Sequence, residues 1–276
     1  MAIACLPWYS LPEVEPAQDA VWSAIARHLR HAGVAAPERL IRNVPIPGVF
    51  CDPDLMLAQC CGYDVVYGFA GSLMVLATPV YAAPGCEGPT YRSFVLVRDD
   101  SPFQEIGDLR GGVCAVNSFN SHSGANALRA LVAPLARDGR FFRAVKVTGA
   151  HVRSLELLMS GRADVMAMDC VLHALLARHR PAALHGTRVI AATEAAPAPP
   201  LVTSAVAGRD RAARVREAVL AAMDDPEAVS AKAELLIDRL EVLPIARYAR
   251  IVEIEGEAVR RGFFELHATS PAIVEG

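Results

Sequence analysis

The feature that most constrains the fold is an alternation of short apolar runs with amphipathic stretches between residues 113 and 192. Apolar runs of strand length alternate there with segments whose apolar residues recur at helical spacing. Strands are predicted over Val113–Val116, Ala144–Thr148, Val165–Met168 and Val189–Ala192, and helices over Ser123–Leu135, Val152–Ser160 and Val171–Arg178. Such alternation is typical of mostly parallel sheets flanked by helices on both faces, so we predict an α/β fold.

The rest of the chain extends this pattern on both sides. Before residue 113, the spacing predicts a helix over Gln18–Ala32 and strands over Ala2–Leu6, Arg39–Val44, Leu55–Ala58, Leu73–Thr78 and Tyr91–Val97. After the prolines at 197–200, a strand over Leu201–Ala207 precedes a mostly helical remainder. We therefore predict two α/β lobes, a discontinuous first lobe of residues 1–96 plus 191–276 and a second lobe of residues 97–190. The two crossings between these lobes would act as hinges.

Composition excludes several classes of protein. Hydrophobic residues make up 53% of the 276 residues and charged residues 21%, which excludes a disordered chain. The net charge of −3 and the scattered basic residues give no electrostatic footprint for nucleic acid. Seven cysteines, among them the adjacent Cys60 and Cys61, include no CxxC pair, and no metal-ligand spacing occurs. We expect no metal, no cofactor and free thiols, which suit a reducing compartment.

Two segments bear on membranes and export. Residues 65–86 carry no charge over 22 positions. Their glycines and prolines favour a short helix, a turn and a buried strand over a membrane-spanning helix. The first residues, up to Leu6, resemble a short strand more than an export signal. The compartment is left open.

The strongest local motif is the polar run 117–126, Asn-Ser-Phe-Asn-Ser-His-Ser-Gly-Ala-Asn, which follows one predicted strand and opens a helix. Hydroxyl groups and free backbone N–H groups meet there at the positive end of a helix, which is an environment suited to an anion. The alternative is ordinary N-capping of that helix by Asn or Ser.

Other candidates follow strands in the same way. His151 comes after one strand and Asp169 after the next, where a ring N–H and a carboxylate face the carboxyl edge of the sheet, although each is equally an N-cap or surface residue. Earlier in the chain, Tyr9, Gln59 and Tyr63 follow strands, and the phenol of Tyr91 supplies a donor at the start of another strand.

Together these motifs resemble a known family. The run Tyr91–Val97, then Ser121-His122-Ser123-Gly124, Gly149-Ala150-His151 and Ala163-Asp164-Val165 with Asp169 behind it, is similar to the phosphonate/phosphite/phosphate substrate-binding proteins of ABC transporters. The similarity extends from about residue 54 to about residue 205. It implies a type 2 periplasmic-binding-protein fold, in which two lobes close on a ligand, and a periplasmic location.

The resemblance also implies residue roles. The anion would be held by Tyr91, Ser121, His122, Ser123, Gly124 and His151, with Asp169 nearby and with Tyr9, Gln59 and Tyr63 facing an interlobe cleft. The chain departs from aminoalkylphosphonate binders at 197–200, where prolines and alanine replace an acidic residue, and at Val171. A small phosphorus oxyanion, or a phosphorus ester with an apolar substituent, therefore fits better than an aminophosphonate.

We accordingly expect a non-enzymatic, monomeric binding protein that takes a small anionic ligand and passes it to an ABC transporter permease. Two alternatives remain. One is a binding protein for a different ligand, such as a sulfonate or a vitamin precursor. The other is a hydrolase in which Ser121 or Ser123, His151 and Asp169 form a nucleophile–base–orienter set.

Overall fold

The computed structural model describes residues 2–263, 265–266 and 273–274, and its contacts divide the chain into two units. Unit 1 contains Met1–Thr90 and Pro197–Ala249, and unit 2 contains Tyr91–Ala196 and Arg250–Gly276. The chain thus passes between the units after Thr90, Ala196 and Ala249. The sequence-based division groups residues 250–276 with the first lobe, whereas their contacts lie in unit 2.

Unit 1 is built on a five-stranded mixed sheet with the strand order β1-β2-β11-β3-β12. Strands β1 and β2 are parallel, β11 is antiparallel to both β2 and β3, and β12 is antiparallel to β3. The strands are β1 (Ile3–Cys5), β2 (Leu55–Gln59), β3 (Leu73–Tyr81), β11 (Leu201–Ser204) and β12 (Ile237–Glu241). All five residues of β2 are buried, as expected for a strand that is covered on both faces.

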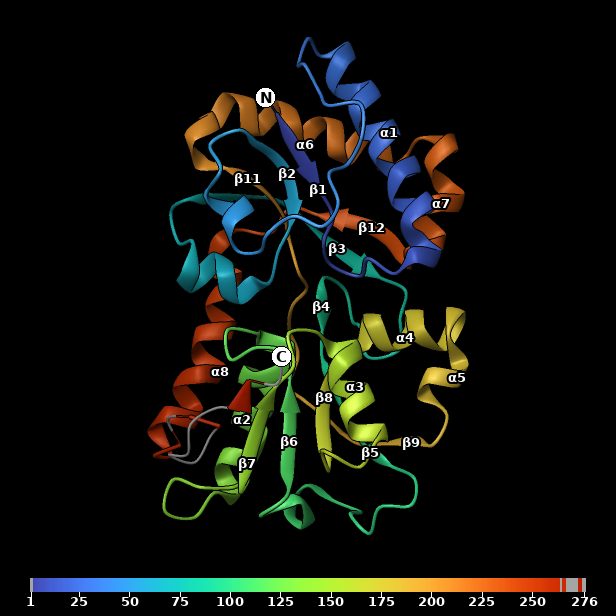
Figure 1. The fold of residues 1–276 in the computed structure, drawn as a ribbon. Helices are drawn as coiled ribbons and strands as arrows, with labels where there is room; N and C mark the ends of the chain where they lie inside the picture. The colour runs from blue at the N-terminus through green and yellow to red at the C-terminus, as the bar shows by residue number, and fades with distance from the viewer. Residues whose placement is uncertain (1, 264, 267–272, 275–276) are drawn as a thin grey trace. The chain divides into compact units, whose positions relative to one another are not determined.

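Helix α1 of unit 1 packs against helices α6 and α7 (Figure 1). Helix α1 (Glu15–His31) buries Val21, Ile25 and Leu29, which recur every four residues on one face. Gly33 follows the end of this helix, and its φ of 71° is the left-handed conformation that favours glycine. The other helices are α6 (Arg209–Met223) and α7 (Val229–Glu234), and a π-turn spans Asp64–Gly68.

Unit 2 carries a six-stranded sheet with the order β13-β7-β6-β8-β5-β9. Strands β13, β7, β6 and β8 are mutually parallel, while β5 runs antiparallel to β8 and β9. The strands are β5 (Ser93–Arg98), β6 (Val113–Val116), β7 (Ala144–Val147), β8 (Val165–Asp169), β9 (Thr187–Ala192) and β13 (Ile273–Val274). The two-residue strands β4 (Thr90–Tyr91) and β10 (Ala196–Pro197) pair with each other and contain two of the crossings.

Helices cover both faces of the unit 2 sheet. Helix α2 (Ala127–Val132) leads from β6 to β7, and α3 (His151–Met159) leads from β7 back past β6 to β8. Because parallel crossovers are right-handed, these opposite directions of travel place α2 and α3 on opposite faces (Figure 1). The remaining helices are α4 (Cys170–His179), α5 (Pro181–Leu184) and α8 (Ala249–Arg260).

The predicted α/β fold class is confirmed, with sheets that are partly parallel. One local prediction is wrong, and one strand was missed. The segment 39–44 forms no strand, because its only backbone tie to β1 is the bond from Ile41 N–H to the carbonyl of Ala4, while Arg42 is held by Gln18 and Asp19. The region after residue 207 is mostly helical, as predicted, and it also contains the unpredicted strand β12, which hydrogen-bonds along the edge of β3.

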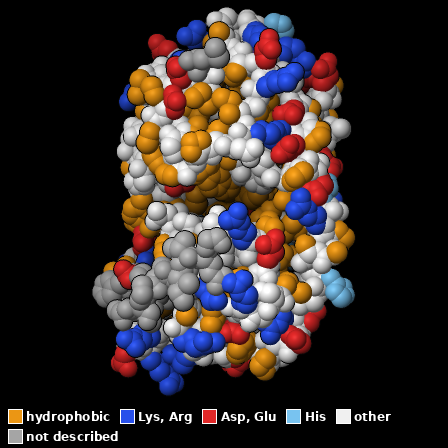
Figure 2. Space-filling view, in the orientation of Figure 1, with side chains coloured by type: hydrophobic (Ala, Val, Ile, Leu, Met, Phe, Trp, Pro, Cys, Tyr) orange, Lys and Arg blue, Asp and Glu red, His pale blue; other side chains and the backbone are white. Residues whose placement is uncertain are grey.

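The surface charge and the helices bear on two classes considered above, nucleic-acid-binding and membrane-spanning proteins. On the face drawn in Figure 2, acidic side chains lie between the basic ones, in keeping with the low net charge. Within the described residues, no helix combines the length and hydropathy that crossing a membrane requires.

Candidate functional site

The polar run after β6 folds into a capped helical turn in unit 2. Ser121 is the N-cap, and its Oγ accepts a hydrogen bond from the Gly124 N–H at 3.1 Å. A π-turn over His122–Asn126 then continues directly into α2. The first N–H groups of a helix have no acceptor within it and mark its positive end. Capping by Ser121 therefore coexists with backbone donors that are available to an anion.

Ser123 and His151 meet at the carboxyl edge of the unit 2 sheet. The two loops that carry them follow the parallel neighbours β6 and β7, and the Gly149 N–H donates to the Asn117 carbonyl at 2.9 Å. Oγ of Ser123 lies 3.1 Å from Nε2 of His151. Burial lowers the pKa of His151 to about 4, and the nearby backbone of Ala167 opposes this shift. The imidazole is therefore neutral at pH 7 and carries one N–H donor.

Gly124 lies against Asn117 and His151. A Cβ at position 124 would lie 1.8 Å from Oδ1 of Asn117 and 3.1 Å from Cε1 of His151. No real Cβ approaches an oxygen at 1.8 Å, so only glycine fits without a rearrangement. Gly124 thus keeps the turn close to both side chains.

His122 and Tyr91 lie next to each other beside this turn. Both side chains are 2% exposed, and their ring centroids are 6.1 Å apart. Burial lowers the pKa of His122 to about 4, against a smaller opposing effect from the Glu255 carboxylate. We call Tyr91, Ser121, His122, Ser123, Gly124 and His151 the donor cluster.

Asp169 has a structural role at the end of β8. Its Oδ1 accepts from the N–H groups of Val171 at 2.8 Å and Leu172 at 3.1 Å, and it thereby caps helix α4. The N-cap alternative is therefore present in the structure.

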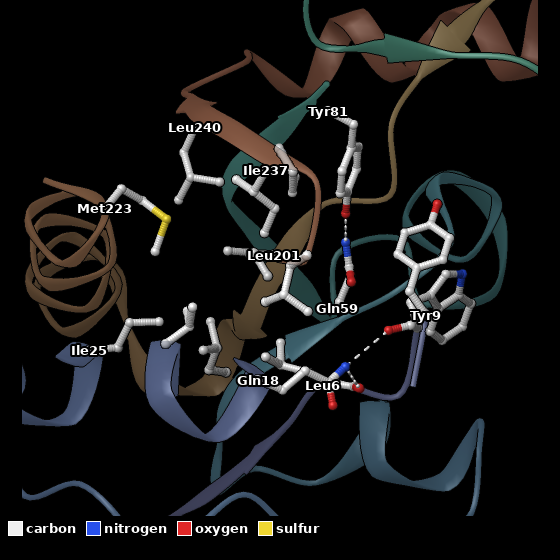
Figure 3. A pocket seen from close by; sticks show the side chains of 15 residues that line it. Leu6, Tyr9, Gln18, Ile25, Gln59, Tyr81, Leu201, Met223, Ile237 and Leu240 are labelled. Atoms are coloured by element: carbon white, nitrogen blue, oxygen red, sulfur yellow. Dashed lines mark hydrogen bonds between the residues drawn. The ribbon is translucent and has the colours of Figure 1, made fainter. Parts of the chain in front are cut away.

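Two of the predicted residues of unit 1 line a pocket within that unit (Figure 3). The pocket has an empty volume of about 530 Å³, part of it open to solvent, and none of its described lining residues is charged. Gln59 donates from Nε2 to the Tyr81 hydroxyl at 2.7 Å and to the Pro199 carbonyl at 3.0 Å. Tyr9, which has a φ of 57°, lies edge-on to Tyr81 with a centroid distance of 5.6 Å. The pocket suits an uncharged, apolar group.

The other predicted residue of unit 1 lies elsewhere. The ring of Tyr63 packs on that of Tyr67 with a centroid distance of 4.6 Å, and Tyr63 is not among the described residues that line the pocket.

In unit 2, sequence reasoning missed two residues that contribute to the donor cluster. These are Asn117, which packs against Gly124, and Asn126, whose Nδ2 lies 3.2 Å from Nδ1 of His122. Both belong to the polar run, and the i, i+4 spacing of His122 and Asn126 was a signal for the second.

Comparison with protein families identifies the chain. The model that describes the periplasmic substrate-binding protein of the ABC phosphonate transporter matches residues 65–248, which is more than half of the chain. The chain belongs to this family. Membership in the phosphonate-binding family implies a small-molecule ligand and a permease partner. No curated protein matches the chain.

Several solved structures share the fold of this chain. A binding protein component of an ABC phosphonate transporter from Pseudomonas aeruginosa aligns with a TM-score of 0.74 at 14% identity, covering 95% of this chain and 87% of that one. PhnD1 from Prochlorococcus marinus, in complex with methylphosphonate, aligns with a TM-score of 0.72 at 15% identity over 94% and 98% of the two chains. XAC2383 from Xanthomonas citri, bound to ATP, gives 0.69 at 16% identity over 95% and 98%.

Proposed function

We propose that this phosphonate-binding family member captures a phosphorus oxyanion through the donor cluster of unit 2 and delivers it to an ABC permease for uptake. The ligand would be a phosphonate, phosphite, phosphate or phosphate ester. The observation that carries the proposal is the hydrogen bond between Ser123 and His151 at the start of the capped helix. It places a hydroxyl, an imidazole and free backbone N–H groups together, and such donors bind tetrahedral oxyanions strongly.

The lack of charge in the donor cluster supports a ligand that is an anion and carries no ammonium group. Both imidazoles are neutral at pH 7 because burial lowers their pKa values. A binding protein for a zwitterion also needs a carboxylate for the ammonium group, and the segment 197–200 offers only prolines and alanine. We therefore favour small oxyanions, or esters with an apolar substituent, over aminoalkylphosphonates. Tyr9, Gln59 and Tyr63 remain proposed ligand contacts.

A hydrolase is the second candidate, because a Ser–His pair is also the start of a catalytic triad. A triad needs a third group that orients the imidazole through Nδ1. No carboxylate among the described residues hydrogen-bonds the buried Nδ1 of His151, and Asp169 caps α4. We therefore propose binding without turnover. Hydrolysis of p-nitrophenyl phosphate or acetate by the protein, lost in Ser123→Ala, would establish the enzyme instead.

Calorimetry tests the binding proposal directly. Phosphate, phosphite, methylphosphonate and phenyl phosphate would each be titrated into the full chain, and saturable binding of at least one is expected. Ser123→Ala should weaken that binding by about 1–3 kcal/mol, because one buried oxyanion acceptor loses its donor. Ser118→Ala is the matched control, since Ser118 lies in the same loop and its Oγ accepts a hydrogen bond from the N–H of Asn120 at 3.1 Å. Failure of all four anions to bind would overturn the proposal.

A further inference from the structure

Two helical segments of unit 2 carry a connected set of polar side chains behind the donor cluster. His122, Asn126 and Arg129 follow one another at spacings of four and three, which places them on one face of the helical segment. Ile251 and Glu255 are four residues apart on helix α8, and the Glu255 carboxylate contacts Arg129. The set therefore links α8 to the turn that begins at His122.

The hydrogen bonds fix the orientation of the Asn126 amide. Arg129 donates from Nη2 to Oδ1 of Asn126 at 3.0 Å and to Oε1 of Glu255 at 2.6 Å. A guanidinium only donates, so the amide oxygen must face Arg129. The Asn126 Nδ2 group then faces the other way, toward the Ile251 carbonyl at 3.3 Å and Nδ1 of His122 at 3.2 Å.

This orientation determines which nitrogen of His122 carries its proton. An amide NH₂ group only donates, so Nδ1 of His122 must accept and cannot carry hydrogen. The proton of the neutral ring then lies on Nε2. The His122 side chain is 2% exposed, and Nε2 has no hydrogen-bond partner among the residues that the structure describes.

We propose that Glu255, Arg129 and Asn126 are positioning residues that hold His122 in its Nε2–H tautomer, so that the ring presents a donor to the bound oxyanion. This inference rests on the proposed function of the same site. The opposite tautomer would place the Nε2 lone pair toward the anion, and the attraction would become a repulsion. Residues that do not touch the ligand thereby determine whether the contact of His122 with the anion is attractive or repulsive.

The tautomer is observable without any variant. Long-range ¹H–¹⁵N spectra of the ¹⁵N-histidine-labelled full chain at pH 7 distinguish a protonated from an unprotonated ring nitrogen, and His122→Gln assigns the signal. We expect His122 to give the Nε2–H pattern before and after methylphosphonate is added. A predominant Nδ1–H pattern would overturn the inference whether or not a substituted protein folds.

Substitution at Asn126 tests the effect on binding. Asn126→Asp keeps the shape and replaces the donor with an acceptor, so Nδ1 should gain the proton, and methylphosphonate affinity should fall about tenfold. Glu253→Gln is a control, because Glu253 lies on α8, as Glu255 does, but accepts a hydrogen bond from Arg250 at 3.0 Å. It should leave both the His122 spectrum and the affinity unchanged.

A double-mutant cycle separates positioning from a general structural effect. In a His122→Ala background, Asn126→Asp should cause almost no further loss of affinity, because its effect passes through the ring. Additive losses, or an unaltered His122 spectrum in Asn126→Asp, would overturn the inference and leave the binding proposal standing. If the unsubstituted protein binds none of the anions, the proposed function fails instead.

Discussion

Nε2 of His151 lies 3.1 Å from Oγ of Ser123, so the first residue of α3 and the turn before α2 share one hydrogen bond. The contact follows from topology, because parallel neighbouring strands deliver their following loops to the same edge of a sheet. Four predictions concern this arrangement, the buried histidines, the Asp169 cap and, in the other unit, the apolar pocket.

Gly124→Ala should abolish anion binding and lower the free energy of unfolding by about 1–3 kcal/mol, because the new methyl group overlaps Asn117 and approaches His151. Gly68→Ala is a matched control. Gly68 also lies in a π-turn, and a Cβ there would come no closer than 3.9 Å to the Asp64 carboxylate. Calorimetry and urea unfolding measure the two effects. Equal behaviour of the two variants would contradict the close approach at Gly124.

Acidification should destabilise the protein through its two buried histidines. The folded pKa values of His122 and His151 are about 4, below the ordinary histidine pKa of 6.5, so the unfolded chain takes up protons first as the pH falls. Stability is therefore complete above about pH 6.5 and decreases toward about pH 4, by about 1.4 kcal/mol per pH unit for each ring.

Urea unfolding at pH 7, 6 and 5 measures this slope, and His122→Gln and His151→Gln should each reduce it. The comparison between variants is needed because burial raises the pKa of Asp64 to about 6, which acts in the opposite direction. A slope that neither substitution changes would show that these rings are not the titrating groups.

Asp169→Asn should retain the cap of α4, because an Asn oxygen accepts the same N–H bonds, whereas Asp169→Ala should cost about 1 kcal/mol. The affinities of Asp169→Asn for methanesulfonate and for methylphosphonate should change in opposite directions. Removal of the negative charge should strengthen methanesulfonate binding and weaken that of methylphosphonate, whose monoanion keeps a proton to donate to the carboxylate. Titration of both anions into Asp169→Asn decides this, and unchanged affinity for both would leave Asp169 with a capping role alone.

The unit 1 pocket should accept added apolar volume. Val21 lines it, so Val21→Ile should raise the free energy of unfolding by up to about 1 kcal/mol as one more methylene is buried. Val219 is fully buried and is not among the described lining residues, so Val219→Ile should destabilise the protein by about 1–3 kcal/mol through overpacking. Thermal unfolding compares the two, and destabilisation by Val21→Ile would mean that the space is already filled.

Sequence periodicity predicted much of the fold because burial imposes it directly. The apolar runs at 113–116 and 165–168 coincide with β6 and β8, whose described residues are all buried. Strand β12 was missed because its charged residues, Asp238, Arg239 and Glu241, suit an exposed edge that pairs on one side only. The pairing of such a strand depends on its neighbour β3, which local pattern does not report.

The residues of the candidate site also differ in how far local sequence predicts them. Ser121 and Ser123 were predictable because a capped turn after a strand is a local feature. The spacing of Asn126 from His122 is a local signal, but the orientation of its amide depends on Arg129 and on Glu255, which lies 126 residues further along the chain, so tertiary structure is needed to establish it. For Asp169, local sequence left capping and ligand binding open, and the structure places its Oδ1 on the N–H groups of α4.

The neutral state of both imidazoles has a consequence for where such a protein can work. Hydrogen bonds from neutral donors to an anion act only at contact distance, and dissolved ions screen them little. The affinity for the anion should then be nearly the same at low and at high salt concentration, whereas the affinity of a receptor that binds through arginine or lysine would fall as the salt concentration rises.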